Sequence, residues 1–171
     1  ALLICGSIAA YRAPDIVRIL RKHGATVQVY ASRSALSFVS ANSLEWSSGN
    51  RVISDLSADA EHLEGKFDFD LFMMAPATYN SINKMAQGIA DDVIPLVMAV
   101  ATGLLERGKT KVAIAPCMNG VMHNSILVEN MKKLANIGVQ FITPLQEDGK
   151  NKLPEIADLV AATEDILKEK S

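Results

Sequence analysis

The sequence predicts an α/β fold in which a doubly wound parallel sheet is covered by helices on both faces. Short apolar runs alternate along the chain with stretches that place apolar residues at helical spacing, as in strand–helix–strand units. The chain has 171 residues, 49% of them hydrophobic and 21% charged, which is enough for one domain with a core on each side of the sheet. We therefore expect residues 1–171 to form a single three-layer domain of the Rossmann-like (flavodoxin-like) class.

Composition and charge argue against several classes of function. A net charge of −2 and a pI near 5.9 provide no basic surface for nucleic acid. The apolar stretch at 93–105 contains Pro95 and Gly103 and is shorter than the roughly 20 residues of a spanning helix, so we expect no membrane segment. Two cysteines, Cys5 and Cys117, make no disulfide framework and suit a cytoplasmic protein. No metal site is expected.

The first strand–loop–helix unit spans residues 2–24, and because the chain opens inside its strand we expect a few preceding residues to be missing. Its loop has one glycine, Gly6, so the dinucleotide fingerprint GxGxxG is absent and a mononucleotide fits better than a pyrophosphate-bridged cofactor. Pro14 is tolerated only in a first turn, which places the start of regular helix near Arg12. Four residues are expected on its buried face: Ile8, Ile16, Val17 and Leu20.

A second strand is expected at residues 26–31, where β-branched and apolar residues alternate before Ser32 and Ser34. Residues 41–67 have the least regular pattern of the chain, with a short extended piece expected at 51–54. The segment contains His62, and a lone loop histidine is open to two interpretations: an exposed side chain without a role, or a catalytic base.

The central stretch, residues 70–92, predicts a buried strand that ends near Pro76, a tight turn and a helix. The turn carries Thr78 and Ser81. Hydroxyl groups there lie beside the free N–H groups of a helix N-terminus, where an open α/β sheet binds anionic ligands. The alternative is that Thr78 only caps the helix.

The rest of the chain repeats the alternation of helices and strands. Residues 146–152 are polar and are expected to be mobile. The expected elements are a helix at 93–104, a strand at 111–115, a helix with its apolar residues between 127 and 137, a strand at 139–142 and a helix at 154–168.

Three of the predicted strands end in a hydroxyl residue, namely Ser7, Ser32 and Thr78. The carboxyl ends of parallel strands meet at one edge of the sheet, so these three side chains are expected to converge. Each of them alone is explained by helix capping, whereas their convergence favours a phosphate site.

Three segments share the motifs of a known family. They are Gly6-Ser7-Ile8-Ala9-Ala10-Tyr11 followed by Ala13-Pro14-Asp15; Ala75-Pro76-Ala77-Thr78 with Asn80, Ser81, Lys84, Gly88 and Asp91; and Pro116-Cys117-Met118-Asn119 with Met122. In this order and at these separations they resemble the opening flavin loop, the PASANT motif and the PxMNxxM motif of the homo-oligomeric flavin-containing cysteine decarboxylases. The resemblance covers essentially the whole chain.

The resemblance implies a cofactor, a substrate and an assembly. It implies flavin mononucleotide (FMN), the decarboxylation of 4′-phosphopantothenoyl-cysteine, and a homo-oligomer, trimer or dodecamer, with the site at a subunit interface. It assigns proton transfer to His62, substrate carboxylate binding to Asn119 and a further substrate contact to Met122. The implied FMN contacts are Gly6, Ser7, Ile8, Ser32, Ser34, Thr78, Tyr79, Asn80 and Ser81.

Two departures from the family pattern affect the chemistry. His123 stands where the family usually has tryptophan or tyrosine, and residues 146–152 lack the cysteine that many bacterial members carry in a flap over the substrate. Cys117 is a possible substitute, and a small buried thiol beside a proline is the other interpretation. Without a substitute, the chain uses another proton donor, makes an oxidised ene-thiol, or does not decarboxylate.

The chemistry of the substrate is consistent with a flavin. The carboxylate of a cysteine derivative leaves slowly because the resulting carbanion has no electron sink, and oxidation of the adjacent CH₂–SH group supplies one. Three alternatives stay open: a flavin-binding regulatory subunit without decarboxylase activity, a flavin prenyltransferase, or a flavin reductase.

Overall fold

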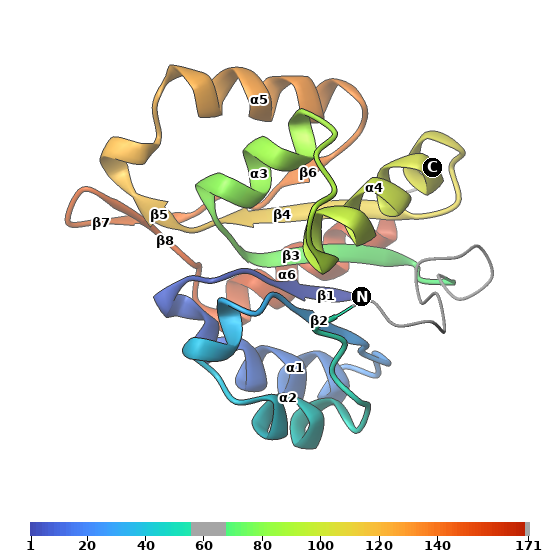
Figure 1. Cartoon of the computed structure of the whole chain (residues 1–171). Coiled ribbons are helices and arrows are strands. Elements are labelled where there is room, and N and C mark those ends of the chain that lie inside the picture. The colour runs from blue at the N-terminus through green and yellow to red at the C-terminus, as the bar shows by residue number, and fades with distance from the viewer. Residues whose placement is uncertain (56–67, 170–171) are drawn as a thin grey trace.

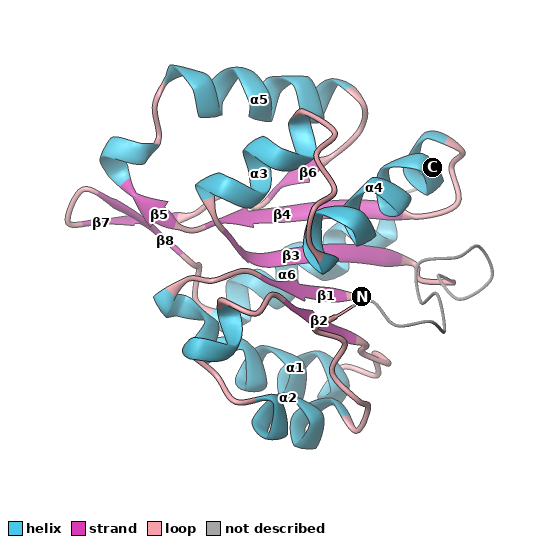
Figure 2. Cartoon of the chain, viewed as in Figure 1, coloured by secondary structure: helices cyan, strands magenta, loops and turns pink. Residues whose placement is uncertain are grey.

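A five-stranded parallel sheet forms the middle layer of the molecule (Figures 1 and 2). The computed structural model describes residues 1–55 and 68–169. Leu2 pairs with Val29 on one side and with Met73 on the other, so the first strand lies inside the sheet. This architecture confirms the predicted fold class. The strands, in spatial order, are β2 (Val29–Ala31), β1 (Leu2–Ile4), β3 (Leu71–Ala77), β4 (Lys111–Pro116) and β6 (Gln140–Phe141).

Helices cover both faces of the sheet. In Figure 1, α1 and α2 lie on one side of the sheet, and α3, α4 and α5 lie on the other. The sixth helix, α6, packs with α1 against the first face. The helices are α1 (Ala13–Lys22), α2 (Ala41–Ser48), α3 (Tyr79–Ala86), α4 (Val93–Glu106), α5 (Ser125–Asn136) and α6 (Ile156–Lys168). Across residues 1–55 and 68–169, no helix is long and apolar enough to cross a membrane.

Each strand contributes side chains to two hydrophobic cores, because successive side chains point to opposite faces of the sheet. In β1, Leu2 and Ile4 pack toward α1 and α6, whereas Leu3 packs toward α3 and α4. All seven residues of β3 are buried. The near-continuous apolar composition of these strands therefore follows from burial on both faces.

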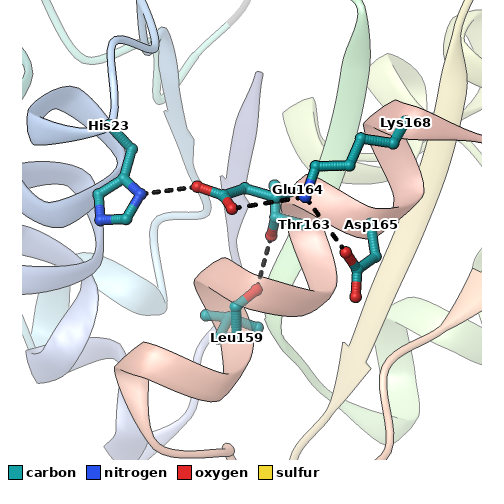
Figure 3. A network of polar contacts seen from close by, with 6 residues as sticks. All are labelled: His23, Leu159, Thr163, Glu164, Asp165 and Lys168. Carbon is teal, nitrogen blue, oxygen red and sulfur yellow. Dashed lines mark hydrogen bonds and ion pairs between the residues drawn. The ribbon is translucent and has the colours of Figure 1, made fainter.

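Helices α1 and α6 are also joined by polar contacts at the end opposite the carboxyl ends of the strands (Figure 3). His23 Nδ1, at the end of α1, lies 2.6 Å from Glu164 Oε1 on α6, and Lys168 reaches the same carboxylate at 3.9 Å. These side chains are exposed, so they contribute little stability compared with the apolar contacts beneath them.

Two expectations about the first 50 residues, one on the burial of Ile8 and one on residues 41–48, are wrong. Ile8 is 70% exposed, because residues Ile8–Arg12 form a 3₁₀ helix (η1) and the buried face begins with α1. Residues 41–48, expected to be irregular, form α2. The Ser40 hydroxyl accepts a hydrogen bond from the Ser43 N–H at its start, and Gly49 ends it with a positive φ of 73°. Both are ordinary helix-end signals.

Residues 146–152, expected to be mobile, belong to a β-hairpin. Strands β7 (Leu145–Glu147) and β8 (Lys150–Lys152) pair with each other, and β8 pairs with β5 (Met118–Asn119). The two turn residues, Asp148 and Gly149, have φ values of 51° and 66°. An Asp-Gly pair with two positive φ angles is the signature of a tight two-residue hairpin, and this signal was present in the sequence.

Candidate functional site

The order of strands creates a crevice at the carboxyl edge of the sheet. From β1 the chain crosses to β2 on one side, and β3 lies on the other side of β1. The loops after β1 and β3 therefore diverge. In open α/β sheets, ligands bind at this switch point, outside the carboxyl ends of the strands.

A cavity of about 340 Å³ occupies this position. It is formed by the loops that follow β1, β2, β3 and β4, together with the start of α4. Its volume is within the usual range of small-molecule sites. The structure brings nine residues singled out from the sequence to its wall: Gly6, Ser7, Ser32, Ser34, Thr78, Tyr79, Asn80, Ser81 and Met122.

The first and second loops meet at Gly6. A Cβ atom built on Gly6 would lie 2.3 Å from Ser34 Oγ, so only glycine permits this approach. Ser34 Oγ is also 3.0 Å from Ser32 Oγ, and Ser32 Oγ accepts a hydrogen bond from the Ala35 N–H at 3.1 Å. The two serine hydroxyls of the second loop are thus held in place by backbone and by each other.

The third loop combines capping with a place in the cavity wall. Thr78 Oγ1 accepts a hydrogen bond from the Ser81 N–H at 3.4 Å and lies 3.1 Å from Ser81 Oγ. Both residues also line the cavity. The two interpretations of Thr78 are therefore compatible: it caps α3, and it presents the N-terminus of α3 to the crevice.

The two cysteines have different surroundings. Cys5 is buried beneath the third loop, and burial raises the pKa of its thiol to about 11 against weaker opposing hydrogen bonds from Ser81 and Thr78. It is therefore a neutral thiol at physiological pH. Cys117 is half-buried in the cavity wall, where its Sγ accepts a hydrogen bond from Ser7 Oγ at 3.7 Å.

Charged residues of the wall come from α3 and from the start of α4. Lys84 lies one turn after Ser81, and its Nζ is 2.7 and 2.8 Å from the two carboxylate oxygens of Asp91. The pKa of Asp91 is lowered, mainly by this hydrogen bond from Lys84. Asp92 also lines the cavity, and its Oδ1 accepts the Val93 N–H at 2.7 Å.

Several wall residues had no assigned place in the site before the structure. The spacing of Lys84 from Ser81, three residues along a predicted helix, was a usable signal for it. Met118 belongs to the PxMN-like segment, whereas nothing local marked Ile94 and Pro95, because they reach the cavity only through the packing of α4.

Two predicted site residues are not among the described residues of the cavity wall. Ile8 points to solvent. Asn119 is exposed, and its Oδ1 accepts a hydrogen bond from the Val121 N–H at 3.1 Å. His62 lies outside the described residues.

The donor set of the cavity suits a phosphorylated aromatic ligand. Hydroxyl groups and the N-terminus of α3 suit an anionic phosphate. Ile94, Pro95, Met118 and Met122 provide an apolar wall for a ring system. Within residues 1–55 and 68–169, no group of three or more His, Cys, Asp or Glu side chains is placed to hold a metal ion.

Fold and cavity together define a doubly wound α/β protein with a cavity at its switch point whose hydroxyl groups suit a phosphorylated ligand. A family model described as Flavoprotein matches residues 1–168. The chain belongs to this family.

Curated relatives share the sequence over most of this chain. It is 36% identical over 164 residues to the coenzyme A biosynthesis bifunctional protein CoaBC of Thermococcus kodakarensis, covering 93% of this chain and 40% of that protein. It is 38% identical over 146 residues to CoaBC of Borreliella burgdorferi, covering 82% of this chain and 36% of that protein. The chain thus spans about two fifths of the length of these relatives.

Solved structures share the fold. HAL3 from Cryptococcus neoformans matches with a TM-score of 0.78 and 27% identity, over 97% of this chain and 94% of that one. The FMN-dependent cysteine decarboxylase SpaF matches with a TM-score of 0.81 and 23% identity, over 97% and 93% of the two chains. At 23% identity the second match supports the fold alone.

Proposed function

We propose that this domain binds FMN in the cavity and catalyses the decarboxylation of 4′-phosphopantothenoyl-cysteine to 4′-phosphopantetheine in coenzyme A biosynthesis. The observation that carries the proposal is the convergence of three hydroxyl-bearing loops and the N-terminus of α3 at the switch point of a Flavoprotein-family chain. The CoaBC relatives, whose name places them in coenzyme A biosynthesis, support the pathway. We also place the protein in the cytoplasm, where free thiols such as Cys5 and Cys117 persist.

The chain's own residues supply the phosphate contacts. The hydroxyls of Ser7, Ser32, Thr78 and Ser81 donate hydrogen bonds to phosphate oxygens, and the first turn of α3 adds free N–H groups. Gly6 lets the first two loops close around the group. FMN, when bound, supplies the two-electron acceptor that oxidation of the substrate's CH₂–SH group requires.

The substrate is handled by His62, Asn119 and Met122 in this proposal. An imidazole has a pKa near neutrality and can take a proton from the substrate thiol or carbon. A neutral amide such as Asn119 orients the carboxylate without holding it so strongly that loss of carbon dioxide is retarded. Met122 contributes apolar surface at the cavity wall.

The final reduction of the ene-thiolate needs a proton at carbon and two electrons, which the reduced flavin would return. Residues 145–152, which form the hairpin, contain no cysteine. Cys117 is a thiol in the cavity wall, and we propose it as the donor: its S–H bond breaks as a C–H bond forms, and solvent reprotonates the thiolate.

We propose a homo-oligomer, trimer or dodecamer, with the cavity at the seam between subunits. Large apolar side chains are exposed on the segments that follow the first and fourth loops, beside the cavity. Ile8 is 70% exposed and Tyr11 63%, both in η1. Val121, in the 3₁₀ turn η3 (Gly120–Met122), is 85% exposed, and Ile126 at the start of α5 is 61% exposed. Surfaces of this kind are usually covered by a partner.

Two measurements test the proposed function. The absorbance spectrum of the purified protein should show oxidised flavin, with bands near about 370 and 450 nm. Added phosphopantothenoyl-cysteine should then release carbon dioxide. A protein without flavin after reconstitution would contradict the proposal, and flavin binding without carbon dioxide release would favour the regulatory alternative.

A further inference from the structure

Lys84 is the one basic side chain among the described residues that line the cavity. It follows Ser81 by three residues on α3, so it shares the face of the helix that carries Ser81 and the capping Thr78 toward the crevice. This cation therefore lines the same cavity as the hydroxyl groups that suit a phosphate.

This cation is already paired. Both oxygens of Asp91 lie within 2.8 Å of Lys84 Nζ, and Asp91 belongs to the connection between α3 and α4. The Asp91 side chain is 55% exposed, against 25% for Lys84. The carboxylate can therefore leave for water at little cost, whereas the ammonium stays at the cavity wall.

An ammonium group has three donors, and a phosphate monoester offers up to two charges and three acceptor oxygens. A bound phosphate is thus a better partner for Lys84 than a half-exposed carboxylate.

We infer that Lys84 exchanges Asp91 for the phosphate of the bound ligand, and that this exchange makes the cavity selective for phosphorylated over unphosphorylated flavin. The inference rests on the proposed function in taking a flavin as the ligand. It assigns Lys84 a direct contact with the ligand and Asp91 the role of a competing partner that holds Lys84 in place beforehand.

The test compares the dissociation constants of FMN and riboflavin for flavin-free protein, measured by flavin fluorescence. The ratio of the two constants isolates the phosphate. Lys84→Met should reduce the preference for FMN by roughly tenfold, the loss of one charge-assisted hydrogen bond, with riboflavin binding changed less than about twofold. Asp91→Asn should increase the preference, because the competitor is gone.

The double variant Lys84→Met/Asp91→Asn distinguishes two roles of the Lys84–Asp91 pair. In one, Lys84 leaves Asp91 for the phosphate; in the other, the pair only stabilises the connection before α4. Exchange predicts that the double variant prefers FMN as weakly as Lys84→Met does. A double variant with the wild-type preference would overturn the inference, and so would an Asp91→Asn variant with no increase. Lys132→Met, which breaks a lysine–glutamate contact on α5, is the matched control and should leave the ratio unchanged.

If Lys84→Met does not fold, Lys84→Gln and Asp91→Asn decide the question by the same ratio. Wild-type protein that binds neither flavin would overturn the proposed function, and this inference with it. Wild-type protein that binds both flavins equally would overturn the inference alone.

Discussion

Single hydroxyl groups at this site have two tasks. Ser7 accepts the Ala9 N–H, Ser32 accepts the Ala35 N–H and Thr78 accepts the Ser81 N–H. Each side chain shapes its own loop and also lines the cavity. A serine or threonine hydroxyl has one donor and two acceptor positions, so a cap that accepts from backbone still has a donor. Ser7 directs its donor to Cys117 Sγ at 3.7 Å, a long contact that a ligand oxygen would replace.

The double variant Ser32→Val/Thr78→Val should therefore release FMN. It removes two hydroxyl donors, and a hydrogen bond to a charged group is worth about 1.5–3 kcal/mol, so affinity should fall at least about 100-fold. Flavin occupancy after dialysis measures this. Ser40→Ala is the control, because it removes the cap of α2, at a cost of about 1 kcal/mol, without touching the cavity. Full flavin occupancy in the double variant would contradict the assignment of these hydroxyls to the phosphate.

Replacing His62 and replacing Asn119 should affect different kinetic constants. His62→Asn should retain flavin and lower kcat by about 100-fold or more, because it removes the base. Asn119→Asp keeps an oxygen to accept the Val121 N–H but places a negative charge against the substrate carboxylate, so KM should rise first. Steady-state kinetics separates the two. Near wild-type turnover by His62→Asn would reject its catalytic role.

The thiols of Cys5 and Cys117 should be alkylated at different rates. With its pKa raised to about 11 by burial, Cys5 is ionised to only about one part in a thousand at pH 8, and its exposure is 1%. Cys117 should react with N-ethylmaleimide, and FMN should slow that reaction, because Cys117 lines the cavity proposed for FMN. Peptide mass spectrometry measures both sites. Equal labelling of the two, or no protection by FMN, would contradict the geometry.

Among the elements, the hairpin β7–β8 acts on the site indirectly, through the loop that carries Asn119 and Met122. Besides the pairing of β8 with β5, the Gly120 N–H donates to the Gly149 carbonyl at 2.9 Å, and Asn151 Nδ2 lies 2.9 Å from His123 Nδ1. The loop that carries Asn119 and Met122 is therefore fastened to the hairpin. His123, noted above as a departure from the family pattern, is a polar partner of this hairpin.

Gly120→Ala should loosen this attachment. A Cβ at Gly120 would lie 2.0 Å from the Gly149 carbonyl oxygen, so backbone must move, at a cost of about 1–3 kcal/mol. Substrate KM should rise while FMN binding persists, because the phosphate loops are not involved. Gly103→Ala in α4 is the control: it meets nothing within 4 Å and should add about 0.5–1 kcal/mol of stability. Thermal unfolding and steady-state kinetics check both, and an unchanged KM in Gly120→Ala would count against the coupling.

For the whole molecule, the exposed apolar residues on either side of the cavity mouth predict association. Light scattering should give a mass of at least three times the 18.4 kDa of one chain. Val121→Glu, on the residue that is 85% exposed, should reduce this mass without unfolding the domain, because it buries nothing in the monomer. A wild-type monomer that binds flavin tightly would contradict the proposal that the cavity lies at a subunit interface.

The sequence by itself determined the order of strands and helices, the parallel sheet and the three hydroxyl turns, because apolar periodicity and strand ends are local properties of the chain. It also contained the signals for α2 and the hairpin, in Ser40, Gly49 and Asp148-Gly149, which are as local as the others. Only the tertiary structure decided which side chains share a cavity. Ile94 enters it, whereas Asn119 turns its amide to its own loop, because these positions depend on how α4 and the hairpin pack against the sheet edge. Contacts between segments that are distant in the sequence cannot be predicted from the periodicity of neighbouring residues.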